Sequence, residues 1–115
     1  MKSMSGKASY LGELEHLILL AVLRCGDDAY TVPIRASLAE RGGRALSRGA
    51  LFTSLDRLEE KGLLRSRMGD ALAVRGGRAR RYFEVTAAGL KAVRAARTAL
   101  EGLSEGLDAL LESKQ

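Results

Sequence analysis

Residues 46–64 of the chain read LSRGALFTSLDRLEEKGLL, a segment with a marked beginning and a marked end. The hydroxyl of Ser47 can accept a hydrogen bond from a first-turn N–H group, and Gly62 suits the left-handed position that ends a helix. Three apolar side chains at spacings of four and three residues form one stripe, and these are Leu51, Leu55 and Leu58. The segment is therefore predicted to be a short amphipathic helix whose leucines face a core.

The opposite face of this predicted helix carries residues of a different kind. At about 100° per residue, Phe52 points away from the leucine stripe, together with Gly49, Thr53 and Asp56. An exposed Phe beside a Gly and a Thr, on the first turns of a capped helix, indicates a contact surface. We expect the first half of the helix to read DNA, because Asp56 and Glu60 would repel phosphates from the second half.

Positive charge is concentrated around the same segment. The 115-residue chain has a formal net charge of +5 and a pI of about 9.8. Residues 41–81 hold eleven Lys or Arg against four Asp or Glu, whereas the segments before and after each carry a net charge of −1. Clustering of this kind is the electrostatic footprint of a nucleic-acid-binding protein. A solvated basic face without a partner is the alternative interpretation.

The flanking segments extend the prediction to a whole fold. Residues 11–23 and 30–41 each read as a helix, and a Gly-containing turn joins the second to the capped helix in a helix-turn-helix pattern. Residues 64–68 and 81–86 can alternate apolar with polar side chains, as half-buried strands do. Between these strands lies a Gly-rich loop with three arginines, Arg75, Arg78 and Arg80. Two strands with a flexible basic loop make a wing, although an ordinary disordered loop is the alternative.

The last segment is predicted to be one long helix from Ala87 to about Glu112, capped by Thr86. Apolar residues recur along it at spacings of three and four, which is a heptad pattern. At 1.5 Å per residue this helix is on the order of 40 Å long, and the helix over residues 11–23 is apolar almost all the way round. We therefore expect a homodimer with an interface formed by Leu14, Leu17, Ile18, Val93, Leu100, Leu103, Leu107 and Leu110. Packing of the two helices within one chain is the alternative, and both can hold at once.

Composition and motifs exclude several other classes. The 46% hydrophobic and 29% charged residues are typical of a soluble globular domain, and the apolar run at residues 17–23 is far shorter than the roughly 18 residues of a membrane span. No signal peptide is evident, and the single cysteine, Cys25, fits a reducing cytoplasm. There is no nucleophile–base pair, metal-ligand spacing or phosphate-binding glycine motif, so we expect no enzyme activity, cofactor or metal. His16, the only histidine, is interpreted as a structural or interface residue.

Four stretches resemble the PadR family of bacterial transcriptional regulators, in its short form with a single C-terminal helix. They are residues 11–20 (LGELEHLILL), 29–34 (AYTVPI), 49–59 (GALFTSLDRLE) and 77–89 (GRARRYFEVTAAG). The resemblance spans about residues 10–112. It departs from the family pattern at Phe52, where Tyr is usual, at Thr53, where many members have Pro, and at Thr31, where Gly is common.

The resemblance implies a mainly α (α+β) fold and a three-part organisation. An N-terminal arm over residues 1–9 precedes a winged helix-turn-helix domain over residues 10–86. A C-terminal dimerisation helix follows over residues 87–115 and packs with the first helix. The implied function is a cytoplasmic transcriptional regulator, expected to be a repressor, that binds a pseudo-palindromic operator in double-stranded DNA as a homodimer.

The predicted helix, the wing and the family resemblance together assign residues to this function. The major-groove contacts are expected from the start of the capped helix, at Ser47, Arg48, Gly49, Phe52 and Thr53. Arg75, Arg78 and Arg80 of the wing are expected on the DNA backbone or in the adjacent minor groove. Family members often respond to small molecules bound between the first and last helices. That implies an effector pocket at His16 and Leu20, with Cys25 as a further polar contact.

Two other classes fit the same residues. In the first, a winged helix serves as a protein-interaction module, and Phe52 and the wing bind a protein partner. In the second, the basic face binds structured RNA. The charge distribution favours nucleic acid over protein, but it does not distinguish DNA from RNA.

Overall fold

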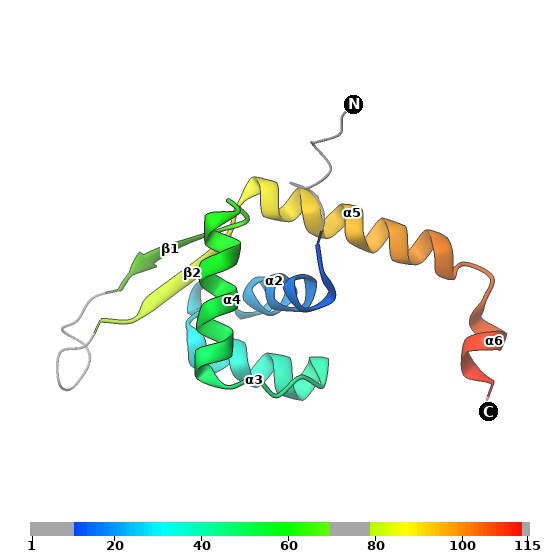
Figure 1. The fold of residues 1–115 in the computed structure, drawn as a ribbon, viewed down its shortest axis with the longest axis horizontal. Coiled ribbons are helices and arrows are strands. Elements are labelled where there is room, and N and C mark those ends of the chain that lie inside the picture. The colour runs from blue at the N-terminus through cyan, green and yellow to red at the C-terminus, as the bar shows by residue number, and fades with distance from the viewer. Residues whose placement is uncertain (1–10, 70–78, 114–115) are drawn as a thin grey trace.

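A computed structural model describes residues 11–69 and 79–113 of the chain (Figure 1). Its elements in order are α2 (Glu13–Cys25), the 3-10 turn η1 (Gly26–Asp28), α3 (Thr31–Gly42), α4 (Arg48–Glu60), β1 (Leu64–Met68), β2 (Arg81–Val85), α5 (Ala87–Ser104) and α6 (Asp108–Glu112). Helices α2, α3 and α4 form a compact unit, the two strands project from it, and α5 leads away toward α6 (Figure 1). The predicted mainly α fold with a two-stranded wing is confirmed.

The core lies between the three helices and the sheet. The stripe predicted on α4 is fully buried, since Leu51, Leu55 and Leu58 are each 0% exposed. It packs in one cluster with apolar side chains that include Ile18 and Leu19 of α2, Ile34 and Leu38 of α3, and Phe83 of β2. Because one side of α4 is committed to this core, its opposite side faces outward.

The ends of the helices follow the sequence signals. The Ser47 hydroxyl accepts a hydrogen bond from the Ala50 N–H at 3.0 Å, and Gly62 has a φ of 80° just after α4. Thr86 accepts from the Gly89 N–H at 3.0 Å and donates to the Gly62 carbonyl at 2.7 Å. The predicted caps at Ser47 and Thr86 and the left-handed Gly62 are therefore confirmed. Through Thr86, the start of α5 is fixed to the end of α4.

Strands β1 and β2 pair antiparallel, with Leu64 opposite Val85 and Met68 opposite Arg81. The ladder closes where the Gly69 N–H donates to the Arg80 carbonyl at 2.6 Å. A further hydrogen bond, from the Phe83 N–H to the Ala29 carbonyl at 2.8 Å, ties β2 to the segment before α3. The stem of the wing is therefore anchored to the helix-turn-helix on one side as well as paired along its length.

The prediction of one continuous helix over residues 87–112 is wrong. Helix α5 ends at Ser104, Gly106 has a φ of 82°, and α6 begins only at Asp108. Glycine adopts the left-handed conformation without strain and weakens a helix interior by about 1 kcal/mol, which favours a break at this position. The predicted heptad seam therefore ends at Leu103, and Leu107 and Leu110 lie beyond the break.

Two residues predicted at a dimer interface lie instead in the core of the chain. Ile18 is 0% exposed and Val93 is 5% exposed, because α2 and α5 pack against each other within one chain. Neither side chain offers a surface to a second copy, which corrects their assignment. By contrast, Leu100, Leu103 and Leu110 are 60%, 81% and 74% exposed.

Candidate nucleic-acid interface

The first turns of α4 present one continuous exposed surface. Phe52, a large apolar side chain, is 37% exposed, whereas Leu51, Leu55 and Leu58 of the same helix are fully buried. The other four residues predicted to contact the major groove are exposed beside it, and these are Ser47, Arg48, Gly49 and Thr53. The structure brings these five residues together because they share one side of one helix.

The position of this surface is fixed from the preceding helix. Arg35 of α3 donates a hydrogen bond from Nε to the carbonyl of Leu46 at 3.0 Å, immediately before the Ser47 cap. Arg44, in the turn between the helices, forms an ion pair with Glu13 at 3.5 Å. Neither contact was predicted from the sequence, since each joins residues from different elements. Together they hold the turn of the helix-turn-helix, from which α4 projects.

Of the three wing arginines predicted to contact DNA, Arg75 and Arg78 lie outside the described residues. Arg80 is exposed directly before β2, and its Cζ atom lies 4.2 Å from the centre of the Tyr30 ring. A side-chain hydrogen bond with Tyr82 raises the pKa of the Arg80 guanidinium above its usual value. Arg80 is thus held at the stem of the wing and remains fully charged.

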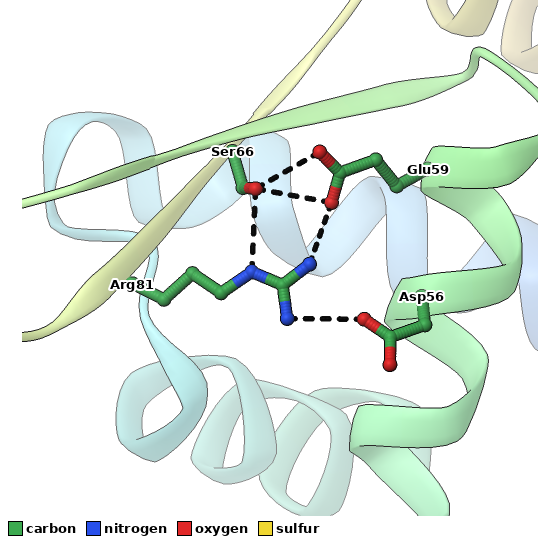
Figure 2. Close-up of polar contacts among 4 residues, drawn as sticks. All are labelled: Asp56, Glu59, Ser66 and Arg81. Atoms are coloured by element: carbon green, nitrogen blue, oxygen red, sulfur yellow. Dashed lines mark hydrogen bonds and ion pairs between the residues drawn. The ribbon is translucent and has the colours of Figure 1, made fainter.

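A polar cluster joins the second half of α4 to the sheet (Figure 2). Arg81 of β2 pairs through Nη1 with Asp56 at 3.0 Å and through Nη2 with Glu59 at 2.6 Å. Its Nε donates to the Ser66 hydroxyl at 3.2 Å, and that hydroxyl donates to both carboxylate oxygens of Glu59, at 2.9 and 3.0 Å. We call these four residues the Arg81 cluster.

The Arg81 cluster changes the electrostatics of α4. Partial burial would lower the pKa of Arg81, but hydrogen bonds to Glu59 and Asp56 raise it, so the guanidinium keeps its charge. Two carboxylates on the same helix as the predicted DNA-reading residues are thereby offset by one cation. Sequence reasoning treated Asp56 only as a source of repulsion and missed Arg81. The available signal was the i, i+3 spacing of Asp56 and Glu59, which places both on one side of the helix.

A pocket of about 670 Å³ lies between α2 and α3. Its lining includes four leucines, a serine and two arginines, namely Leu17, Leu20, Leu23, Leu38, Ser37, Arg24 and Arg41. The effector pocket was predicted between the first and last helices, at His16 and Leu20. Leu20 lines this pocket between α2 and α3, and His16 does not. His16 has a buried Nε2 atom with no hydrogen-bond partner among the described residues. Burial, followed by the charge of Arg97, lowers the pKa of His16.

Residues 11–69 and 79–113 contain no group of three His, Cys, Asp or Glu side chains that could hold a metal ion. Within the same ranges no helix is both long enough and apolar enough to cross a membrane. Cys25 lies with its Sγ atom 3.9 Å from the Ser37 hydroxyl.

A helix-turn-helix followed by a two-stranded wing defines a winged helix-turn-helix protein. Residues 19–95, more than half of the chain, match the family model described as the Transcriptional regulator PadR-like family, and the chain belongs to this family. Its members regulate transcription, so the predicted family and the general function are confirmed. Among curated proteins, none matches the chain significantly.

Similar solved structures come from several bacteria. A PadR family transcription regulator from Clostridium difficile R20291 superposes with a TM-score of 0.71 at 22% identity, over 87% of this chain and 99% of that chain. A PadR-like transcription factor from Bacteroides fragilis gives 0.70 at 24% identity, over 92% and 95%. A PadR family transcriptional regulator from Eggerthella lenta gives 0.64 at 28% identity, over 89% and 88%. The fold is therefore shared along nearly the full length of these chains.

Proposed function

We propose that this PadR-family protein is a cytoplasmic repressor that binds a pseudo-palindromic operator in duplex DNA as a homodimer. The observation that carries the proposal is the exposed surface at the start of α4, where Phe52 projects outward from a capped helix. Phe52 is 37% exposed, whereas the leucines of the same helix are fully buried, and apolar contact with a thymine methyl group is a recognised form of base readout.

Each residue of the proposed interface has a separate role. Arg48 would bind a guanine or a phosphate, Thr53 a base edge, and Ser47 and Gly49 would permit close approach of the helix start. Arg80 would contact the DNA backbone or the minor groove, as would Arg75 and Arg78. In a two-fold dimer the two α4 helices would lie about 34 Å apart, on half-sites one helical turn apart.

The decisive experiment is a mobility shift with duplex DNA from upstream of the protein's own coding sequence. We expect a shifted band that becomes stronger at low salt and that persists in the presence of an excess of scrambled competitor duplex. Failure to bind at low salt by a demonstrably folded dimer would favour the protein-interaction module. Preferential displacement of the duplex by a structured RNA would favour the RNA-binding module.

We expect Phe52→Ala to lower affinity for the operator about fivefold to tenfold and to leave binding of scrambled duplex almost unchanged, because a base contact carries sequence preference. Fluorescence anisotropy with both duplexes measures the two affinities. Phe52→Tyr is the matched variant, since it keeps the ring and adds a hydroxyl that can donate to a phosphate. An equal loss of affinity on both duplexes would remove Phe52 from base readout.

The dimer part of the proposal rests on exposed leucines of α5 and α6 and on the pocket between α2 and α3. We propose that the C-terminal part of a second copy, with Leu103 and Leu110, covers Leu17 and Leu23. Charge supports this pairing, because Arg24 and Arg41 line the pocket while four exposed carboxylates lie on the C-terminal segment, at Glu101, Glu105, Asp108 and Glu112. Exposed leucines at this density are typical of an association surface.

Leu110→Asp is expected to raise the dimer dissociation constant at least about tenfold, because it places a charge in an apolar contact. Sedimentation equilibrium measures this constant. Val32→Asp is the matched control, since Val32 is also exposed, at 62%, but lies on α3 outside the lining of the pocket. A wild-type protein that is monomeric at tens of micromolar would contradict the dimer outright.

Release from DNA by a small-molecule effector completes the proposal. The pocket between α2 and α3 would suit an apolar acid, because leucines form its walls and two guanidiniums border it. A ligand beside Leu20 would compete with the partner's C-terminal segment and so alter the spacing of the two α4 helices. An effector of this kind would act on the dimer interface and not directly on the residues of α4 that contact DNA.

A further inference from the structure

Four side chains from three segments stack at the stem of the wing. The rings of Tyr30 and Tyr82 meet edge to face, with centres 5.6 Å apart and planes at 65°. The guanidinium carbon of Arg80 lies 4.2 Å from the centre of the Tyr30 ring, and that of Arg67 lies 4.8 Å from the centre of the Tyr82 ring. We call Arg67, Tyr82, Tyr30 and Arg80 the Arg–Tyr stack.

The fold determines this arrangement. Arg67 and Tyr82 are directly opposite each other in the β1–β2 ladder, and Tyr30 precedes the first residue of α3. Gly69 closes the ladder, and a Cβ atom at that position would lie 2.6 Å from Cε1 of Tyr82, so a larger residue would displace the ring. The stack therefore joins the sheet to the helix-turn-helix at a defined place.

The arginines of the sheet fall into two groups. Arg65 pairs with Glu84 at 3.2 Å and Arg81 pairs with Asp56 and Glu59, so both guanidiniums direct donors to carboxylates. Arg67 and Arg80 take part in no ion pair between the residues that the structure describes, and both are exposed. A guanidinium over a ring uses its face, while its N–H donors lie in its own plane. Arg80 directs one donor to the Tyr82 side chain, and its other donors can still reach a ligand.

We propose that the Arg–Tyr stack is a second site for the DNA backbone, in which Arg67 and Arg80 each bind a phosphate. Tyr30 and Tyr82 are positioning residues, which hold two flexible cations in place before DNA arrives. This inference rests on the proposed DNA-binding function, and it assigns phosphate contacts to the stem of the wing in addition to its loop. A planar guanidinium suits a phosphate because it can donate two parallel hydrogen bonds.

The test is the salt dependence of binding to the upstream duplex, for single variants of the stem. Arg67→Ala and Arg80→Ala are each expected to reduce the slope of log K against log salt by about 0.9, which is the loss of one phosphate contact. Affinity should fall several-fold, equally on operator and scrambled DNA. Arg65→Ala is the matched control, because it removes the same charge two residues away on the same face of β1 and should leave the slope near the wild-type value.

Variants of Tyr30 test the positioning role. Tyr30→Leu removes the ring beneath Arg80 and is expected to reduce the salt slope as Arg80→Ala does, whereas Tyr30→Phe keeps the ring and the slope. Thermal unfolding confirms that each variant is folded. If Arg67→Ala and Arg80→Ala behave like Arg65→Ala while the wild type binds DNA, this inference is wrong and Arg80 leaves the proposed interface, but the proposed DNA-binding function stands. If the wild type binds no duplex, the proposed function fails and the inference with it.

Discussion

Replacing Gly89 with alanine is expected to lower the free energy of unfolding by about 3 kcal/mol, which is a large effect for one methyl group. A Cβ atom at Gly89 would lie 2.2 Å from the carbonyl oxygen of Leu63 and 2.6 Å from Cγ1 of Val85. Neither neighbour can move freely, because the Leu63 carbonyl accepts a hydrogen bond from the Thr86 N–H at 3.1 Å and Val85 is paired with Leu64 in the sheet. The first turn of α5 would have to shift as a whole.

Chemical denaturation at a fixed protein concentration measures this loss, since the stability of a dimer depends on concentration. Gly102→Ala is the matched control, because Gly102 lies in the same helix with no atom within 4 Å of a Cβ. Alanine there should raise the free energy of unfolding by about 0.5 to 1 kcal/mol. The two substitutions are chemically identical and should have opposite signs. Equal stability of both variants would mean that α5 does not pack on Leu63 as the structure has it.

Helix α4 could be predicted from the sequence because the signals that define it are local. Ser47, Gly62 and the leucine stripe all lie within one short segment, and each acts through bonds or contacts inside the helix or directly beside it. The five residues at the start of α4 come together for the same reason. Their contact with DNA stays a prediction, whereas their shared exposed surface follows from helical geometry alone.

The Arg81 cluster and the Arg–Tyr stack could not be predicted in this way. Arg81 meets Glu59 across 22 positions of sequence, and the contact depends on the register of two strands and on their angle to α4. No spacing rule covers such a pair. Tyr30 and Tyr82 likewise lie in different segments, 52 positions apart in the sequence. The hydrogen bond from the Phe83 N–H to the Ala29 carbonyl brings their segments together in the folded chain.

The C-terminal segment shows where periodicity misleads. A glycine in a helical pattern costs only about 1 kcal/mol, so Gly106 could either continue the helix or end it. The structure has it in the left-handed conformation, and the leucines beyond it belong to a separate short helix. Ile18 was misassigned for a related reason. An all-round apolar helix must be covered on every side, but the sequence does not say which side α5 covers.

Removing the charge of Arg81 is expected to weaken DNA binding strongly, although Arg81 is not among the residues proposed to contact DNA. Arg81→Gln would leave Asp56 and Glu59 without their cation on the helix that approaches the major groove. Like charges brought together across an interface cost several kcal/mol, so the operator affinity should fall about tenfold to hundredfold. The stability loss should be smaller, about 1 kcal/mol, because Arg81 and Glu59 are 29% and 33% exposed and Asp56 is 57% exposed, so solvent screens the pairs.

A compensating variant separates this electrostatic role from a direct contact. Asp56→Asn with Glu59→Gln removes the two carboxylates, and adding Arg81→Gln to that background should then change operator affinity by no more than about threefold. If Arg81→Gln weakens binding equally with and without the carboxylates, Arg81 must bind a phosphate itself. The carboxylates of Asp56 and Glu59 would then have no part in the effect of Arg81 on DNA binding. A small effect of Arg81→Gln in that background would instead mean that β2 supports DNA binding indirectly, because Arg81 offsets the carboxylates in the second half of α4.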